Sequence, residues 1–245
     1  MKRIFKFLTK PKKEVKQTKP IELPKRQFNE VALDLETLAL EETSVILSIG
    51  LVPFNMDSYN DLLHTLNLER EEDLQVISSV IFTHIRELPT SRYYKLDILD
   101  QFEKGRIASK STLDFWKKQA LINSEAASVL DRSASDITLE DSLTDILEHL
   151  TTYVEPMNYH GSGRIVCRGY DFDCGKLESA LGMYEGKKAP WNHSRRRCSR
   201  SLIDAYFDTT KGFSGLTKPV NMVAHSALDD AAWDATQLIM GRGLR

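Results

Sequence analysis

The chain has 245 residues, of which 41 % are hydrophobic and 28 % are charged, and it carries a formal net charge of −2. This length and hydrophobic content suffice for a domain with a sizeable core, and the three cysteines, an odd number without a Cys-x-x-Cys pair, argue against a disulfide framework and for a reducing compartment. No apolar run reaches the roughly 18 residues that span a bilayer, and the first residues make a poor signal peptide, so we expect a soluble, cytoplasmic protein.

The first 27 residues are predicted to form a basic arm. Residues 1–26 hold ten Lys or Arg against two Glu, a balance of +8, which leaves −10 for the rest of the chain. A basic segment punctuated by proline is typical of a disordered tail. It either attracts phosphate groups in a salt-dependent way or serves as a solubilising linker, and the sequence favours neither. Because no linker interrupts residues 28–245, we expect one domain there.

The first predicted strand, Glu30–Thr37, carries Asp34 and Glu36. Side chains at positions i and i+2 of a strand share a face, so these two carboxylates project together. Two adjacent carboxylates resist ionising together unless a cation compensates them, which makes the pair a candidate divalent-metal site. The alternative is an ordinary solvated strand face, since Asp-x-Glu is common by accident. The opposite face is expected to meet a core through Val31, Leu33 and Leu35.

Two more strands are predicted, over residues 45–52 and around 63–68, and we expect them to form an antiparallel meander with the first strand. A capping box at Ser111–Asp114 predicts the start of a helix with two adjacent aromatic residues. Apolar residues recur at helical spacing over 138–153, which predicts the clearest helix of the chain. Strands followed by strand–helix units indicate an α/β fold with a mixed sheet flanked by helices.

A second acidic segment follows the predicted strand 164–168. Gly169 turns the chain there, and Asp171 and Asp173 precede a helix predicted over 177–181. Ligands of such sheets collect at the carboxyl ends of the strands. Asp173, or with less support Asp171, is therefore a candidate third metal carboxylate. The alternative is a helix N-cap, a position that aspartate suits well.

The last predicted helix runs from about residue 226 to 240, begins beside His225 and carries Asp230. Small residues in its first turns allow a close approach to the sheet. Asp230 is a candidate for completing the acidic cluster, and His225 is a candidate proton acceptor, since a neutral imidazole near pH 7 suits that role. The alternative is a structural histidine, with Asp229 as an exposed neighbour.

Taken together and in this order, the three segments resemble the DEDDh exonucleases, a superfamily with a ribonuclease H-like fold. The resemblance covers most of residues 28–245. Three segments are similar to bacteriophage exodeoxyribonuclease A and a related group of bacterial exoribonucleases: Ile46–Gly50, Ser111–Trp116 and Arg168–Asp173. Phe115-Trp116 stands where that group has paired tryptophans, and the group's Arg-Asp-x-Arg-Thr segment is degenerate in Arg197–Ser201.

The resemblance implies a ribonuclease H-like mixed sheet, with an antiparallel meander plus parallel strands. It implies a metal-dependent 3′–5′ exonuclease that releases nucleoside monophosphates from the 3′ end of single-stranded DNA by two-metal-ion hydrolysis. His225 would be the general base. The ligands of two Mg²⁺ or Mn²⁺ ions would be Asp34, Glu36, Asp173 and Asp230. The candidate substrate contacts are Thr37, Leu38, Phe115, Trp116 and Arg200, although one of the two aromatic residues is expected to belong to the core.

Two alternatives stay open. One is an exoribonuclease of the same fold, and the other is a non-catalytic nucleic-acid-binding or polymerase-associated module, because a fold alone does not establish chemistry. Four converging acids favour an enzyme. A phage origin, which would place the protein in the host cytoplasm, follows only from the resemblance.

Overall fold

The structure is a computed structural model that describes residues 27–65, 71–184, 186 and 188–245. Within these residues a five-stranded sheet has the strand order β3-β2-β1-β4-β5. The strands are β1 (Glu30–Thr37), β2 (Ile46–Phe54), β3 (Arg92–Lys95), β4 (Arg164–Cys167) and β5 (Arg196–Cys198). β2 is antiparallel to β1 and β3, whereas β4 is parallel to β1 and β5. This confirms the predicted mixed α/β sheet of a ribonuclease H-like fold.

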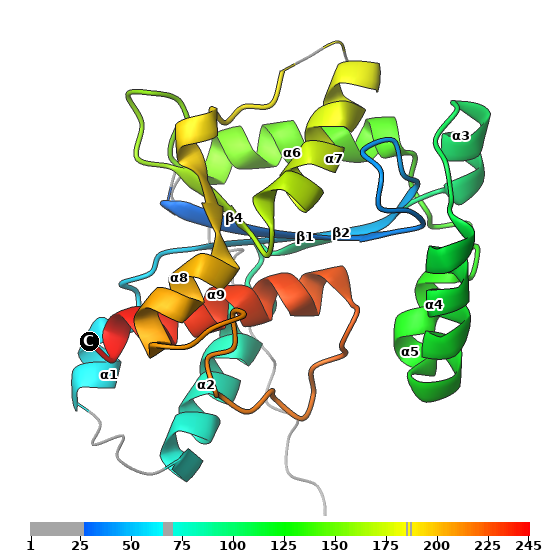
Figure 1. Cartoon of the computed structure of the whole chain (residues 1–245). Helices are drawn as coiled ribbons and strands as arrows, with labels where there is room; N and C mark the ends of the chain where they lie inside the picture. The colour runs from blue at the N-terminus through cyan, green and yellow to red at the C-terminus, as the bar shows by residue number, and fades with distance from the viewer. Residues whose placement is uncertain (1–26, 66–70, 185, 187) are drawn as a thin grey trace, which may run out of the picture.

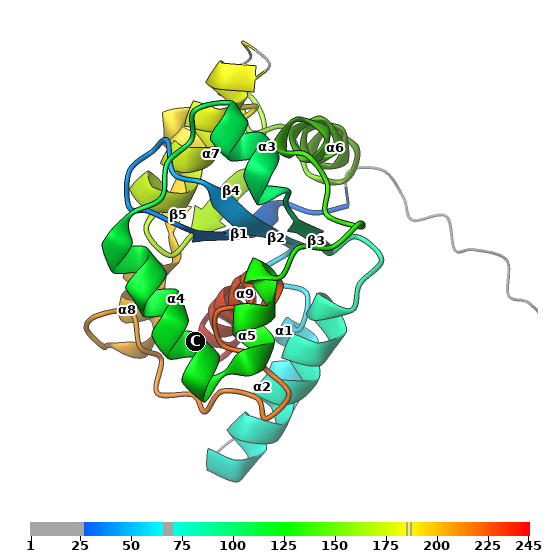
Figure 2. The ribbon, with the colours of Figure 1, turned by 90° about the vertical axis from the view of Figure 1, so that its right-hand side faces the viewer.

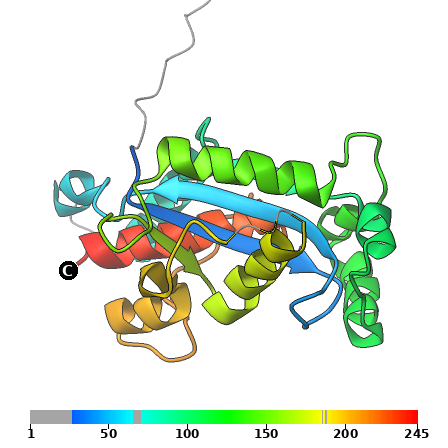
Figure 3. The ribbon, with the colours of Figure 1, turned by 90° about the horizontal axis from the view of Figure 1, so that it is seen from above.

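Helices cover both faces of the sheet (Figure 1). On one face lie α6 (Leu139–Tyr153) and α7 (Tyr170–Tyr184), which cross above the strands in Figure 3. On the other face lie α1 (Asn60–Thr65), α2 (Glu71–Arg86), α8 (Ser199–Phe207) and α9 (Ala227–Gly243). The remaining helical segments are α3 (Ile98–Glu103), α4 (Lys110–Ile122), α5 (Ser124–Ala127), η1 (Ser128–Leu130) and η2 (His193–Arg195). Figure 2 shows α3, α4 and α5 at the end of the sheet.

Successive side chains of β1 point to opposite faces of the sheet and so pack into two separate cores. Val31, Leu33 and Leu35 pack under α6 and α7, as predicted, while Ala32 packs against α9. Asp34 shares the α9 face with Ala32, because side chains two residues apart on a strand point the same way. Since helices cover both faces, all nine residues of β2 are buried. The acidic pair of β1 therefore faces another layer of protein rather than open solvent.

The prediction of a strand around residues 63–68 was wrong. Residues 60–65 form α1, and residues 66–70 lie outside the described residues. Leu63 is buried and lies close to α9 at Gly243, while His64 is exposed. A short helix also places a buried residue next to an exposed one, so over so few residues it cannot be distinguished by sequence from the alternation of a strand. The third strand of the meander is β3, which pairs with β2.

The predicted helices are present, but two of them start earlier than expected. α4 begins at Lys110 because the Ser109 hydroxyl, two residues before the predicted capping box, accepts the N–H of Thr112. α7 begins at Tyr170, directly after Gly169, which turns the chain with a φ of +119°. α6 starts after its cap Thr138, as predicted.

Among the described residues, the longest helices are too short or too polar to cross a membrane. The basic arm predicted for residues 1–27 falls, apart from its last residue, outside the described part of the chain.

Candidate active site

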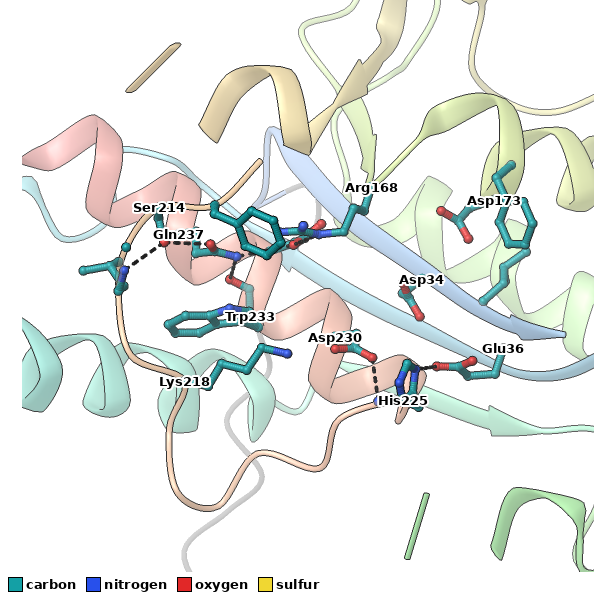
Figure 4. A pocket seen from close by; sticks show the side chains of 16 residues that line it. Asp34, Glu36, Arg168, Asp173, Ser214, Lys218, His225, Asp230, Trp233 and Gln237 are labelled. Atoms are coloured by element: carbon teal, nitrogen blue, oxygen red, sulfur yellow. Dashed lines mark hydrogen bonds and ion pairs between the residues drawn. The ribbon is translucent and has the colours of Figure 1, made fainter. Parts of the chain in front are cut away.

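The five predicted catalytic residues line one pocket of about 470 Å³. It lies where the carboxyl end of β1 meets the first turns of α7 and α9. Figure 4 shows four carboxylates around a common space, with His225 at its edge. They come from three distant stretches of the chain: Asp34, Glu36, Asp173 and Asp230.

A glycine on β2 lets the last helix reach the acidic pair. Gly50 pairs with Asp34 across the β1–β2 ladder. A Cβ at Gly50 would lie 2.1 Å from the carbonyl oxygen of Ala227, so any larger residue would collide with the start of α9. Ala227 and Ala231 are themselves buried. This close approach brings Asp230 to the acids of β1.

The turn after β4 positions the third carboxylate. Because α7 begins right after Gly169, Asp173 falls in the first turn of the helix and points back to β1. Asp173 is buried, and its carboxylate also accepts a hydrogen bond from the backbone of Leu35. Asp171 is exposed and does not line the pocket. Of the two aspartates considered from the sequence, the structure brings Asp173 to the cluster.

Burial and mutual repulsion disfavour ionisation of the cluster. Burial raises the pKa of Asp34 well above its ordinary value, and the charges of Asp173, Asp230 and Glu36 raise it further. Burial likewise raises the pKa of Glu36 to about 8, that of Asp173 to about 7 and that of Asp230 to about 6. Near neutral pH the four groups therefore cannot all be charged unless positive charge is added.

The donor set fits hard divalent cations. Ligand atoms of Glu36, Asp230 and His225 lie within 4.8 Å of one another, and Asp34 and Asp173 add carboxylate oxygens to the same pocket. Carboxylate oxygens suit Mg²⁺ and Mn²⁺. A cation would also relieve the repulsion that raises these pKa values. The residues present therefore fit such ions on both chemistry and charge.

His225 stands at the mouth of the pocket in a left-handed conformation, with a φ of +65°. Its Nδ1 lies 3.9 Å from Oε1 of Glu36, and its backbone N–H donates to Oδ2 of Asp230 at 2.9 Å. Burial lowers the pKa of the imidazole below its ordinary value, and the charge of Lys218 adds to this effect. The ring is therefore neutral near pH 7, the state that a proton acceptor needs.

The predicted substrate contacts divide into exposed and buried residues. Phe115 is 37 % exposed, and its ring lies 5.2 Å from that of His225. Trp116 is only 1 % exposed and donates its indole N–H to the carbonyl of Thr37, so it holds the end of β1 from within the core. Arg200 is exposed at the start of α8, and its charge lowers the pKa of Asp173.

The side chains of Thr37 and Leu38 are buried as well, and they do not line the pocket. The Thr37 hydroxyl donates to the carbonyl of Ala39, and Leu38 packs in a small core with Trp116. As side-chain contacts to a substrate, Thr37, Leu38 and Trp116 are therefore not supported by this structure. They belong to the frame that holds Phe115 and the end of β1.

Asp234 and Lys218 are charged pocket residues that the sequence analysis did not single out. Asp234 lies one helical turn after Asp230, accepts from Arg168 Nε at 3.0 Å and also accepts from the Ser199 hydroxyl. The spacing of four residues on a predicted helix was a signal for Asp234. Lys218 lies on the loop before α9 and lowers the pKa of Asp230. No local pattern marks Lys218, because its place depends on the path of a loop.

Asp229 is buried between α9 and its neighbours. It is 0 % exposed, so it is not the exposed neighbour of Asp230 that the alternative interpretation of this segment allowed. Its carboxylate accepts from Arg86 Nε at 2.5 Å and from the backbone N–H of Val223 at 2.7 Å. The side of α9 that faces away from the pocket packs against α2 and the loop before α9. These two elements cover Asp229 and exclude solvent from it.

The fold and the pocket define a ribonuclease H-like domain with an acidic centre. The sequence model described as the 3′-5′ exoribonuclease Rv2179c-like domain matches residues 29–240. The chain therefore belongs to this family of 3′–5′ exonucleases, and it is a hydrolase that acts on nucleic acid. No curated protein matches the chain. The DEDDh assignment and the likeness to a phage enzyme stay predictions.

Proposed function

We propose that this chain is a metal-dependent 3′–5′ exoribonuclease of the DEDDh type, with residues 28–245 as its catalytic domain. The observation that carries the proposal is the convergence of four carboxylates and a neutral histidine in one pocket. RNA is favoured because the matched family is described as an exoribonuclease domain. The DNA preference expected from the phage resemblance, a phage origin and a cytoplasmic location remain predictions.

Two divalent cations would be held by Asp34, Glu36, Asp173 and Asp230. When bound, such ions stabilise the charge that develops on the attacking and leaving oxygens of an in-line displacement at phosphorus. The raised pKa values of three of these carboxylates, about 8 for Glu36, 7 for Asp173 and 6 for Asp230, support this assignment. They describe a site that is incomplete without added positive charge.

His225 would act as the general base. Its neutral imidazole would accept a proton from the attacking water while the water oxygen bonds to phosphorus. The bond from phosphorus to the 3′ oxygen of the preceding nucleotide then breaks, and that oxygen leaves with the shortened strand. The product is a nucleoside 5′-monophosphate. The hydrogen bond from the His225 backbone to Asp230 ties this residue to the carboxylate cluster.

Phe115 and Lys218 are the side chains best placed to meet the substrate. Phe115 presents a partly exposed ring beside His225, and an aromatic ring can stack on any base. Lys218 lines the pocket beside Asp230 (Figure 4), where its ammonium group would attract a phosphate. Neither contact reads the sequence of the strand.

The test is nucleotide release from two single strands of equal sequence, one RNA and one DNA, labelled at the 5′ end. We expect stepwise shortening from the 3′ end with Mg²⁺ or Mn²⁺ and none with a chelator. Asp173→Asn should abolish it, whereas the exposed neighbour variant Asp171→Asn should match the wild type. Equal, metal-independent release by the wild type and Asp173→Asn would refute the proposal, and binding without release would favour a non-catalytic module.

A further inference from the structure

The turn that carries His225 is held by hydrogen bonds to α9 and to Asn123, the residue that joins α4 to α5. The N–H of Val223 donates to Asp229, and the N–H of His225 donates to Asp230, both on α9. The side-chain amide of Asn123, the residue that follows α4, donates to the carbonyl of Ala224 at 3.0 Å. Because His225 adopts a φ of +65°, a conformation unusual for a residue with a Cβ, its backbone needs such anchors.

One of these anchors depends on a buried charge. Asp229 is fully buried, and a buried carboxylate is costly unless a cation and hydrogen-bond donors compensate it. Arg86, at the end of α2, supplies the cation: its Nε lies 2.5 Å from Oδ1 of Asp229 and its side chain is 30 % exposed. The second oxygen, Oδ2, accepts from Val223. Arg86 thus holds one oxygen of Asp229 and leaves the other oriented toward the turn.

Packing alone does not hold the turn on this side. A second cavity of about 260 Å³ lies behind His225, and its walls include Arg86, Tyr93 and Asp229. His225 borders both this cavity and the main pocket. The His225 ring packs against Phe115, but cavities border the turn on two sides, so its backbone relies on the hydrogen bonds to keep its position.

We propose that Arg86 is a positioning residue for His225, acting through Asp229 and the N–H of Val223. This inference rests on the proposed role of His225 as general base. It assigns a function to a residue of α2, 143 positions away from Asp229 in the chain, that touches neither the carboxylate cluster nor the main pocket. Asp230 should keep its place without Arg86, because the contact between Gly50 and Ala227 fixes the start of α9.

The first test compares Arg86→Met with the control Arg242→Met. Arg242 lies on α9, and this control removes its surface ion pair with Asp57. We expect Arg86→Met to lower kcat by about 10²-fold, since small misplacements of catalytic groups have effects of that size. KM and Mn²⁺ affinity should stay within about twofold, because only a transition-state interaction is lost. In a His225→Ala background, Arg86→Met should have no further effect on kcat.

A buried, unpaired Asp229 could unfold Arg86→Met, so a second variant replaces the pair. Arg86→Met combined with Asp229→Asn removes the buried charge but keeps an amide oxygen that accepts from Val223. This double variant should recover stability and most of the lost kcat. If it is folded, as judged by thermal unfolding, and kcat does not recover, Arg86 does not act through the turn.

Hydrogen exchange provides a readout that needs no activity. In Arg86→Met, amides of segment 221–226 should exchange faster than in the wild type, while those of β1 should be unchanged. Unchanged exchange in this segment, or an equal loss of kcat with and without His225, would overturn the inference. If the wild type releases no nucleotide at all, the proposed function fails, and the exchange measurement still decides whether Arg86 orders the turn.

Discussion

His225 donates its backbone N–H to Oδ2 of Asp230 at 2.9 Å, so the proposed general base is hydrogen-bonded to a proposed metal ligand. The two residues are five positions apart: His225 precedes α9, and Asp230 lies in its first turn. Any change that moves Asp230 therefore also moves His225, whereas the imidazole ring can be removed without loss of the carboxylate. This asymmetry separates the effects of substitutions at the two positions.

His225→Ala should lower kcat by about 10² to 10⁴-fold, the usual contribution of a general base, and leave Mn²⁺ binding largely intact. The reason is that the alanine backbone still donates to Asp230. The measurements are steady-state kinetics and titration calorimetry with Mn²⁺, and His64→Ala, at an exposed histidine of α1, is the matched control. A large loss of Mn²⁺ affinity would instead make His225 a ligand.

The metal-free protein should lose stability as pH rises toward 8. Glu36, Asp173 and Asp230 have folded-state pKa values raised to about 8, 7 and 6, so the folded state binds more protons than the unfolded state in this range. Their contribution is fully present below the ordinary carboxyl pKa and disappears as pH rises through the raised values. Thermal unfolding with chelator should show this decline.

Added Mn²⁺ should reverse the decline, and its stabilising effect should be larger at about pH 8 than at about pH 5, because cations compete with protons for the same oxygens. Glu36→Gln, which cannot titrate at this position, should weaken both effects. A stabilisation by Mn²⁺ that is the same at both pH values would contradict the assignment of these carboxylates as ligands.

A buried histidine far from the pocket should limit stability in acid. Burial lowers the pKa of His149 on α6 to about 4 from the ordinary 6.5. The unfolded state then binds the proton first, so stability falls as pH drops through this window, by about 3 kcal/mol in total. His149→Phe, which keeps a ring next to Tyr153, should show a smaller loss in urea titrations across this range. Parallel stability curves for both proteins would exclude this role.

Gly50→Ala should destabilise the fold by about 1 to 3 kcal/mol, as overpacking usually does, and should reduce kcat. The added Cβ would meet the carbonyl oxygen of Ala227 at 2.1 Å and push α9 away from the acids of β1. Gly182→Ala on α7 is the control, since a Cβ there meets nothing within 4 Å. Gly182→Ala should leave the free energy of unfolding unchanged or raise it by up to about 1 kcal/mol. Urea unfolding and kinetics distinguish the two variants.

Deletion of residues 1–26 should flatten the salt dependence of binding to a single strand. This segment carries a net charge of +8, and each phosphate contact contributes about −0.7 to the slope of log K against log salt concentration. Fluorescence anisotropy with a labelled strand and chelator measures the slope without hydrolysis. A slope equal to that of the full chain would make the arm a spacer.

Local patterns were sufficient for the acidic centre but not for its surroundings. The period-two alternation of β1 places Asp34 and Glu36 on one face whatever covers it, and the small residues of α9 indicate its close approach. Asp229 and Asp230 are adjacent in sequence, yet one meets Arg86 and the other meets the pocket. Their difference depends on where α2 and the loop before α9 lie, which no local pattern encodes.

The same limit explains why the strand prediction around residues 63–68 was wrong and why the sequence could not tell which of Phe115 and Trp116 belongs to the core. Leu63 belongs to the short helix α1 and is buried close to Gly243, a contact across 180 positions of sequence that overrides the apparent alternation. Trp116 seemed suited to stacking on a base, but the carbonyl of Thr37 satisfies its indole N–H inside the core. In both cases a long-range partner decides the role of a residue whose local sequence allows two.

The close contact between Gly50 and Ala227 has a consequence for synthesis of the chain. β1 and α7 leave the ribosome before α9, so a growing polypeptide already holds Asp34 and Asp173 while the helix that delivers His225 and Asp230 is still missing. The pocket therefore stays open on one side, without His225 and Asp230, until α9 docks against Gly50.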